Sequence, residues 1–381
     1  MLERSKLDYF KYCLSPVVLL LSAWGLWVGG NYTWVGLGTL LALLFGDAFL
    51  KSDYSVRDQR WPWIYDAVIA VTVILSIVNV VYYAWLVGAG HFATTASAWG
   101  AFLSMMFVGF VVAAPPVHEL FHREGTFLRT LGRVGSTAVI FDPWREITHV
   151  VTHHMHVSTP DDPDYARRGD TVYGHLVRTF PRQIKEAYHL ERMMWRKRGR
   201  KWWNPHNAWV PRAASMVAFA TLLYAVGGGL GMVLALASVL AGPRLLLEVF
   251  NYCNHYGLIS ASPGHFQRQH TWNHLTPFVR ILALEITNHY GHHMDGYKPF
   301  YALEPDEGGP EQPQFLMAVL LALVPPMWFA VIKPLLKDWD AHYATPQERE
   351  IAYAENARAG WHDLNGGLPM PPEKSAHLLP A

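Results

Sequence analysis

The sequence predicts an all-α integral membrane protein with six transmembrane helices. Three observations lead to this fold class: apolar residues gather in long blocks, lysine and arginine fall on one side of those blocks, and histidines cluster near the ends of some of them. A chain of 381 residues with 51% apolar content could also form two soluble domains, but their apolar residues would be spread more evenly. A helix of about 20 apolar residues spans the roughly 30 Å of bilayer hydrocarbon.

Six apolar runs have this length, and they cover residues 13–30, 33–50, 64–88, 95–117, 209–227 and 228–252. Short connections make hairpins of the first two, the next two and the last two runs, and the last hairpin turns at Gly227, Gly228, Gly229 and Gly231. The first run is not expected to be a cleaved signal peptide, because no small-residue cleavage site follows it and the second run begins almost at once.

The basic residues in the short connections predict the orientation. They lie before the first run and after the second, as Arg4, Lys6, Lys11, Lys51, Arg57 and Arg60. The connections near residues 30, 88 and 228 carry none. Because cytoplasmic loops are enriched in lysine and arginine, we expect both termini in the cytoplasm and a multi-pass protein of the cell inner membrane.

The chain is therefore expected to divide into membrane helices over 1–117, a cytoplasmic segment over 118–208, two further membrane helices over 209–252, and a cytoplasmic segment over 253–381. A seventh apolar run, 315–332, is interrupted by Pro325 and Pro326. It is interpreted as a re-entrant or interfacial element, since a full span would carry the charged tail across the membrane. In the tail, TPQE at 345–348 predicts a helix start with Thr345 as cap and Glu348 reaching back.

Of the 20 histidines, nine fall into four compact groups: His118 and His122; His149, His153 and His154; His255; and His289, His292 and His293. Residues three or four apart share one face of a helix, so a group can direct two imidazoles at one point. Two groups follow the fourth and sixth runs on the cytoplasmic side, and the others lie in the cytoplasmic segments. All four can meet at one membrane face.

Nine imidazoles packed together without a shared cation would leave many polar atoms unsatisfied, so the pattern predicts a metal centre. Imidazole suits zinc, copper, iron and nickel. A tetrahedral zinc takes three or four protein ligands, whereas nine histidines fit two ions of higher coordination, which favours two irons. Cys13 and Cys253 are the only cysteines and can build neither a disulfide framework nor an iron–sulfur cluster, so redox chemistry must use other ligands or a partner protein.

Two other functions are consistent with part of the pattern. HELFH matches the zinc-peptidase signature, in which His118 and His122 would bind zinc and Glu119 would activate water, but this membrane protease would leave the other grouped histidines without a role. A metal transporter would place histidines and carboxylates inside the spans, whereas here they gather outside them.

The combination of HELFHR, HVVTHH, NYCNHYG and NHYGHH resembles the integral-membrane, histidine-rich diiron monooxygenases, closely the alkane and xylene monooxygenases, over nearly the whole chain. Membrane fatty-acid desaturases share three histidine boxes but do not usually carry NYCNHYG. Alkane hydroxylases typically read LQRHSDHH in the last box. Here that box reads EITNHYGHHMDGYKPFYAL, and with KDWDAHYATPQERE it is similar to the hydroxylase component of xylene and p-cymene monooxygenases.

This resemblance implies a non-haem diiron monooxygenase that hydroxylates methyl groups of alkylaromatic hydrocarbons such as xylene, toluene and p-cymene. It implies O2 as co-substrate and a NADH-dependent flavin and iron–sulfur reductase as electron donor. Terminal hydroxylation of medium-chain alkanes and fatty-acyl desaturation remain the alternatives. The iron ligands implied by the resemblance are His118, His122, His149, His153, His154, His255, His289, His292 and His293.

Three carboxylates are candidates to accept the second ring N–H of a ligating histidine, because each lies at helical spacing from one. Glu146 precedes His149, Glu285 precedes His289, and Glu248 precedes His255. Glu248 also follows Arg244 by four residues inside the last predicted span, so a functional charge and a structural ion pair are both open.

The remaining polar residues near the boxes have simpler interpretations. His156, His270 and His274 are read as structural or as supports of the ligands. Asp161, Asp162 and Asp164 could cap a helix, pair with Arg167 or Arg168, or touch a metal. The basic run is either an interfacial anchor or a docking surface for the electron donor, and it comprises Arg192, Arg196, Lys197, Arg198, Arg200 and Lys201.

Overall fold

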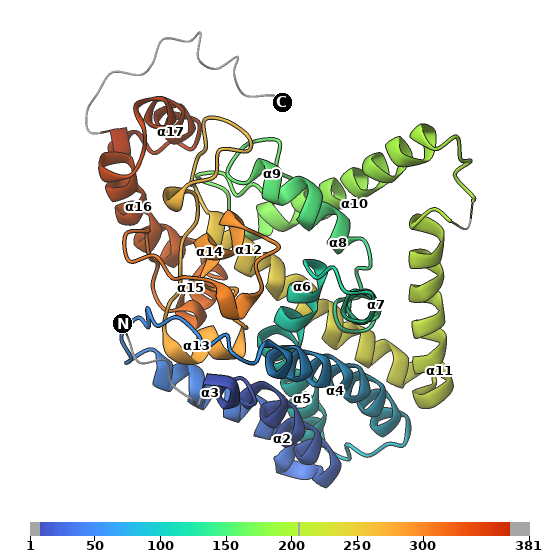
Figure 1. The fold of residues 1–381 in the computed structure, drawn as a ribbon. Coiled ribbons are helices and arrows are strands. Elements are labelled where there is room, and N and C mark those ends of the chain that lie inside the picture. Colours follow the sequence, from blue (N-terminus) through green and yellow to red (C-terminus); the bar gives the residue numbers. More distant parts are fainter. Residues whose placement is uncertain (1–7, 205, 366–381) are drawn as a thin grey trace.

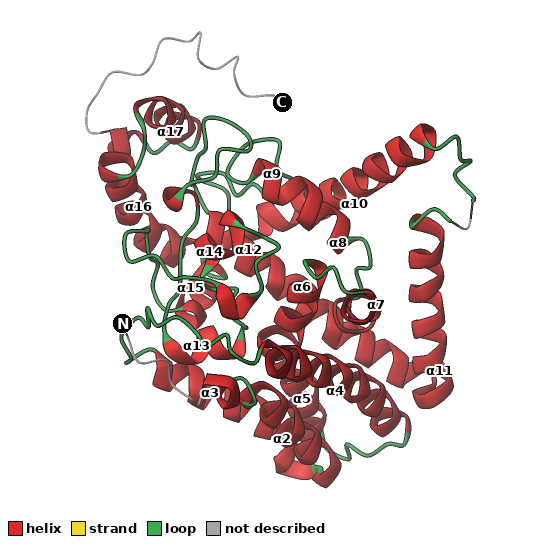
Figure 2. Ribbon diagram, viewed as in Figure 1, coloured by secondary structure: helices red, strands yellow, loops and turns green. Residues whose placement is uncertain are grey.

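The structure, a computed structural model, describes residues 8–204 and 206–365. Over this part of the chain the secondary structure is helical, and Figure 2 shows helices joined by loops. One isolated parallel bridge, between Asn273 and Glu311, is the only strand-like pairing in the described residues. The prediction of an all-helical fold is confirmed. Arg4 and Lys6, on which the predicted orientation partly rests, lie outside the described residues.

Four helical stretches are long and apolar enough to cross a membrane: Asp8–Val28, Pro62–Gly88, Thr95–Phe121 and Trp209–His255. They contain α1 (Asp8–Lys11), α2 (Leu14–Val28), α4 (Pro62–Gly88), α5 (Thr95–Val108), η2 (Gly109–Ala113), α6 (Ala114–Phe121), α11 (Trp209–Val239), η5 (Leu240–Leu246) and α12 (Leu247–His255). In Figure 1, α2 to α5 lie together at one end of the molecule. The chain is thus a membrane protein, as its apolar blocks indicate.

The structure differs from the six predicted spans at two places. The run at 33–50 forms α3 (Val35–Asp47), whose 13 residues reach only about 20 Å, after the short turn η1 (Gly30–Trp34). The runs at 209–227 and 228–252 belong to one helical stretch, but its backbone breaks at Gly228, where φ is 64° and ψ is −171°. A positive φ is readily adopted by glycine. In Figure 1 the ribbon changes direction sharply within α11. The number of membrane crossings stays a prediction.

Many of the most exposed large apolar side chains lie on these helices. Phe45 on α3 is 67% exposed, Val78 on α4 is 53% exposed, and Val217 and Leu230 on α11 are 67% and 64% exposed. Soluble proteins rarely leave so much apolar surface contiguous. These side chains are suited to contact with lipid.

The segment after α6 contains short helices and one long one: α7 (Thr126–Gly135), η3 (Ser136–Ile140), α8 (Arg145–Ile147), η4 (Thr148–His153), α9 (His154–His156) and α10 (Val172–Lys197). The segment after α12 contains η6 (Arg268–His270), α13 (Pro277–Leu282), α14 (His289–Met294), η7 (Phe300–Ala302), α15 (Phe315–Ala322), α16 (Pro325–His342), α17 (Pro346–Arg358) and η8 (His362–Asn365). Figure 1 places α14 beside α12 in the middle of the molecule, with α6, α8 and α9 near them.

The seventh apolar run forms two helices rather than one. The eight residues of α15 are too few to span a membrane, and α16 starts afresh at Pro325. Its assignment as a re-entrant or interfacial element stays a prediction. The predicted helix start in the tail is confirmed: α17 begins at Pro346, Thr345 Oγ1 accepts from Glu348 N at 3.3 Å, and Thr345 N donates to Glu348 Oε2 at 2.9 Å.

Candidate metal centre

Four parts of the chain bring the nine grouped histidines together. They come from α6 and its C-cap, from η4 and α9, from the end of α12, and from α14. Eight are buried and His154 is half-buried. Their ligand nitrogens form two sets with all members within 4.8 Å of one another: His118, His122, His149 and His292, and His153, His255, His289 and His293.

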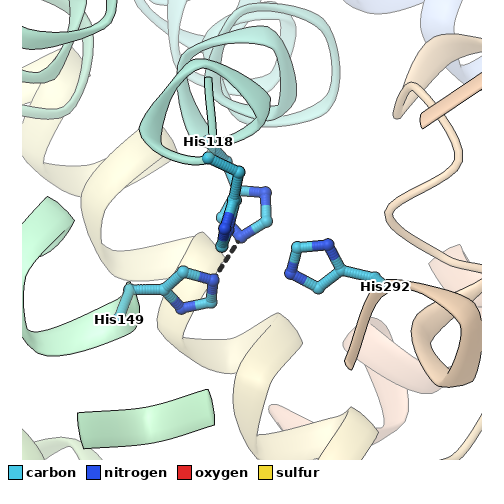
Figure 3. Close-up of side chains that lie close together, drawn as sticks. His118, His149 and His292 are labelled. Carbon is cyan, nitrogen blue, oxygen red and sulfur yellow. Dashed lines mark hydrogen bonds between the residues drawn. The ribbon is translucent and has the colours of Figure 1, made fainter. Parts of the chain in front are cut away.

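In the first set, His118 Nε2 lies 2.6 Å from His149 Nε2, and Figure 3 shows the rings of His118, His149 and His292 directed at a common space. In the second set, His289 Nε2 lies 2.9 Å from His255 Nε2 and 3.2 Å from His293 Nε2. Two nitrogens bound at right angles to an ion at about 2.1 Å would lie about 3 Å apart. The spacing in both sets therefore fits the coordination sphere of a metal ion.

His154 lies between the two sets. Its Nε2 is 3.2 Å from His149 Nε2, and its ring centroid is 4.5 Å from that of His293. The two sets are thus neighbours in one buried cluster rather than separate sites.

The local fold explains why THVVTHH divides its histidines. The residues Thr148–His153 form a π-helical turn, and the N–H of His154 donates to the carbonyl of His149 five residues earlier. The ring of His154 lies beside the first set, with its centroid 4.8 Å from that of His149 and 4.9 Å from that of His122. His153, one position earlier, turns toward the second set.

Ring nitrogens without a hydrogen-bond partner indicate whether the histidine cluster can hold a cation. Among the described residues, the buried Nε2 atoms of His122, His153 and His292 have no hydrogen-bond partner. A buried polar atom without a partner is destabilising, and neutral imidazoles can satisfy each other only in donor–acceptor pairs. A metal ion would accept a lone pair from each ring at once, so the residues fit the group.

Electrostatics favour the neutral, ligating form of these rings. Burial and the neighbouring imidazoles hold the pKa of His149, His154, His292 and His293 well below the ordinary value. Burial also lowers the pKa of His122 to about 4 and that of His289 to about 3. At neutral pH these rings keep a lone pair free for a metal.

One carboxylate of the TPDDPDY stretch supports the cluster directly. His153 Nδ1 lies 2.9 Å from Asp162 Oδ2, and both groups are fully buried. Burial opposes charge on His153, but Asp162 raises the pKa of that ring. Pairing with a carboxylate fixes the ring and directs its Nε2 into the second set. The sequence offered Asp162 as a capping, pairing or metal-contacting residue, without indicating His153 as its partner.

The three carboxylates that sequence spacing placed beside ligating histidines instead form hydrogen bonds and ion pairs with other side chains. Glu146 accepts from Arg129 and Arg133 at 3.2 Å each and from Arg212 at 2.7 Å. Burial would raise its pKa, but the three arginines lower it. In the described chain no hydrogen bond joins Glu146 to His149, because the arginines occupy its oxygens.

Glu285 is held by Arg57 and Arg280, and it accepts a hydrogen bond from Tyr12. The predicted partner His289 instead uses Nδ1 on the carbonyl of Ile286, at 3.0 Å. The Glu285 carboxylate and the His289 ring therefore have different hydrogen-bond partners, although the two residues are four positions apart.

Glu248 takes part in a buried polar network away from His255. Gln183 Nε2 donates to Glu248 Oε2 at 2.8 Å, Arg244 lies 3.5 Å from the same oxygen, and His175 Nε2 lies 3.4 Å from Oε1. Of the two interpretations left open by the sequence, the geometry favours the structural ion pair. The participation of His175 and Gln183 could not be foreseen, because no spacing connects α10 with α12.

Of the other histidines near the boxes, His270 and His274 have structural partners, whereas the buried Nδ1 of His156 has no hydrogen-bond partner among the described residues. His270 Nε2 pairs with Glu348 at 2.7 Å, and His274 bonds the carbonyl of Pro313 at 2.9 Å and Asn254 Oδ1 at 3.1 Å. Asp164 pairs with Arg145 at 2.8 Å instead of with Arg167 or Arg168.

Glu119, which would be the general base in the protease alternative, already accepts hydrogen bonds from other residues. Its Oε1 accepts from Arg123 Nε at 3.0 Å and from the backbone N–H of Phe300 at 3.2 Å. Its neighbours His118 and His122 belong to a set that also includes His149 and His292, unlike a peptidase site built on HELFH alone.

Comparison with known proteins decides the family. A sequence model of the fatty acid desaturase family matches residues 93–306. The chain is also 35% identical, over 93% of its length and 96% of the relative, to the xylene/toluene monooxygenase hydroxylase component XylM of Pseudomonas putida. The chain therefore belongs to the fatty acid desaturase family, which the model represents.

Other relatives are alkane monooxygenases. The chain is 31% identical to alkane 1-monooxygenase 1 of Pseudomonas aeruginosa over 81% of this chain and 82% of that one. It is 27% identical to the alkane 1-monooxygenase of Ectopseudomonas oleovorans over 84% of this chain and 80% of that one. The chain is therefore an O2-dependent hydrocarbon monooxygenase of the membrane alkane and xylene type, and the membrane protease alternative is excluded.

Proposed function

We propose that this chain is the hydroxylase component of a diiron monooxygenase that hydroxylates methyl groups of alkylaromatic hydrocarbons of the xylene, toluene and p-cymene type. Two adjacent buried sets of histidine nitrogens support the diiron site. The similarity to a xylene/toluene monooxygenase component over 93% of the chain supports the substrate class.

In this proposal the first iron is held by His118, His122, His149, His154 and His292, and the second by His153, His255, His289 and His293. When bound, the irons supply the redox chemistry that reduces O2 and transfers one oxygen atom to carbon. The overall reaction joins hydrocarbon, O2, two electrons and two protons to give an alcohol and water. The protein fixes the rings through the Asp162 carboxylate and the Ile286 carbonyl.

A hydrocarbon presents no charge to bind, so the protein must supply position and dryness. A narrow, largely apolar cavity lies among the membrane helices and is lined in part by Met105, Gly109 and Ala113. Ala113 precedes His118 by five residues, about 7 Å along a helix. Its volume is about 20 Å³, so it must widen for a substrate, and the flexible side chain of Met105 can move aside. We assign the apolar body of the hydrocarbon to this space, with the reacting methyl group directed toward the histidines.

Product analysis tests the substrate class. Iron-replete cells that express the chain with a compatible reductase would be fed p-xylene and n-octane together. We expect mainly 4-methylbenzyl alcohol. Mainly 1-octanol would keep the diiron chemistry but favour the alkane alternative, for which the alkane 1-monooxygenase relatives provide support.

The electron donor in this proposal is a NADH-dependent flavin and iron–sulfur reductase that docks at the end of α10. Both cysteines are free and the site is all histidine, so electrons come from a separate partner. Lys197 lines one surface cleft together with Val151 and Tyr297. A Cβ on Gly296, next to Tyr297, would lie 3.0 Å from His154 Cε1, so this cleft approaches the cluster closely.

Neutralising the exposed residues Arg196, Lys197 and Arg198 together with glutamine is expected to raise the KM for reductase about three- to tenfold, because surface charges act mainly on association. The KM is measured from NADH-dependent product formation at rising reductase concentration, with Lys337→Gln as an exposed control. Loss of iron from the triple variant, with KM unchanged, would contradict the docking role.

The proposal also includes the topology: six membrane crossings in the cell inner membrane, both termini and the histidine cluster on the cytoplasmic side, and the segment boundaries after residues 117, 208 and 252. The basic residues in the connections support this arrangement.

A further inference from the structure

A row of stacked aromatic rings runs from the edge of the histidine cluster to the protein surface. The rings of Tyr301 and Tyr65 stack with their centroids 4.7 Å apart. Tyr9 follows at 4.8 Å from Tyr65, and Trp61 follows at 5.6 Å from Tyr9. These are distances of aromatic rings in contact. The three tyrosines are at most 8% exposed, whereas Trp61 is 50% exposed. These four residues, here called the aromatic row, therefore connect the interior with the surface.

The buried end of the row lies against α6 and its C-cap, which supply two histidines of the first set. Arg123, the residue after His122, has its guanidinium carbon 5.6 Å from the centre of the Tyr301 ring. The backbone N–H of Phe300, next to Tyr301, donates to Glu119 Oε1 at 3.2 Å. The row thus begins beside the residues that are next to metal ligands in the chain.

The row has the chemistry of a path for single electrons. Phenol and indole rings can each give up one electron to a strong oxidant, and an oxidised phenol also releases its proton. Tyr9 has an acceptor for this proton, because its O–H donates to Asp58 Oδ1 at 2.6 Å. Arg60 lies 2.5 Å from the other oxygen of Asp58 and stabilises its ionised form. The O–H of Tyr65 donates to the backbone carbonyl of Asp58 at 2.9 Å. A missing electron in the row is therefore best accommodated at Tyr9.

A monooxygenase needs such a path when O2 is reduced without bound hydrocarbon. In the proposed reaction O2 takes four electrons, two from the reductase and two from the hydrocarbon. Without hydrocarbon the last two are missing, and the side chains nearest the metal centre are then exposed to oxidation. The histidine cluster is buried, so a reductant in solution does not reach it directly.

We propose that the aromatic row protects the metal centre by supplying these two missing electrons one at a time. This inference rests on the proposed function. Electrons move inward from Trp61, the proton of Tyr9 passes to Asp58 and returns, and a thiol, the usual reductant of the cytoplasm, reduces Trp61 again. In the proposed topology Trp61 lies at the end of a cytoplasmic connection. In total, O2, two electrons from the reductase, two protons and two thiols give two waters and one disulfide.

The first test removes the exposed end of the row with Trp61→Phe. Trp63→Phe is the matched control, because Trp63 is 66% exposed, lies two residues further on and forms no aromatic pair in the described chain. Each purified holoenzyme receives reductase, NADH, O2 and glutathione, without hydrocarbon. We expect Trp61→Phe to be inactivated after at least about threefold fewer NADH oxidised, because the buried site admits no other reductant. Mass spectrometry should then find oxidised ligand histidines.

Iron content and the initial rate with p-xylene are expected to stay unchanged in both tryptophan variants. Trp63→Phe should last as long as the unaltered protein. Equal lifetimes and equal histidine oxidation in Trp61→Phe and Trp63→Phe would overturn the proposal.

A second pair of variants has a readout that packing alone would not change. Tyr65→Phe keeps the ring but removes the oxidisable phenol, and Tyr83→Phe does the same for a buried tyrosine that packs against Phe92. Samples frozen during turnover without hydrocarbon or thiol are examined by electron paramagnetic resonance. We expect a tyrosyl radical in the unaltered chain and in Tyr83→Phe, and its loss from Tyr65→Phe. An equal radical signal in both variants would contradict the path through Tyr65.

The outcomes separate this inference from the function on which it rests. If the unaltered chain hydroxylates no hydrocarbon, the proposed function fails. If it is active and Trp61→Phe survives as long as Trp63→Phe, the protective role of the aromatic row alone fails.

Discussion

Replacing His153 with alanine is expected to remove one of two irons and to lower hydroxylation more than a hundredfold. Loss of an outer partner of a metal ligand typically lowers affinity or activity 10- to 100-fold, and loss of the ligand itself should exceed that range. His153 is fully buried, its Nε2 has no protein partner, and its nitrogen lies within the set formed with His255, His289 and His293. Iron per chain and product formation would be measured on the same purified sample.

His156→Ala is the matched control, because it removes the same side chain three residues further on. His156 is half-buried and belongs to neither ligand set. The control is expected to retain about two irons and its activity. A His153→Ala protein that is folded, as judged by its thermal unfolding in detergent, and still holds two irons would show that the second set is not a metal site.

The histidine groups could be predicted from the sequence because their chemistry and their close spacing are both local. HELFH places His118 and His122 one turn apart, and NHYGHH does the same for His289 and His293. The helix start at Thr345 was predictable for the same reason, since the cap and Glu348 are three residues apart.

The division into two sets could not be predicted. It depends on a π-helical turn at Thr148–His153 and on four elements that meet only in the folded chain. The hydrogen-bond partners of the carboxylates could not be predicted from the sequence either. Spacing placed Glu146 near His149, but Arg212, from a helix 66 residues later, lies closer to its oxygens than any ring that spacing suggested. Sequence spacing shows which side chains can come close on one helix, but it does not show which of the possible hydrogen bonds form in the folded chain.

The second large effect is expected from Glu285→Gln, which disturbs a buried ion network instead of the metal site. Glu285 is fully buried and pairs with Arg57 at 2.8 Å and with Arg280 at 2.5 Å. Leu284 and Glu285 both have positive φ, 47° and 59°, a conformation that non-glycine residues adopt only when the surroundings enforce it. The network thereby fixes the loop that leads into His289, His292 and His293.

Removing one partner of a buried pair leaves charge without compensation, which typically destabilises by about 3–5 kcal/mol. We expect Glu285→Gln to lower the thermal unfolding temperature in detergent and to reduce iron content, although the residue touches no histidine ring. Glu304→Gln provides the comparison: Glu304 is 71% exposed, lies 3.6 Å from Lys298 and follows the same histidine box. An exposed pair contributes at most about 1 kcal/mol, so this variant should unfold like the unaltered protein. If Glu285→Gln and Glu304→Gln unfold at the same temperature and hold equal iron, the network does not support the last histidine box, and the positive φ angles at Leu284 and Glu285 must be held by apolar packing alone.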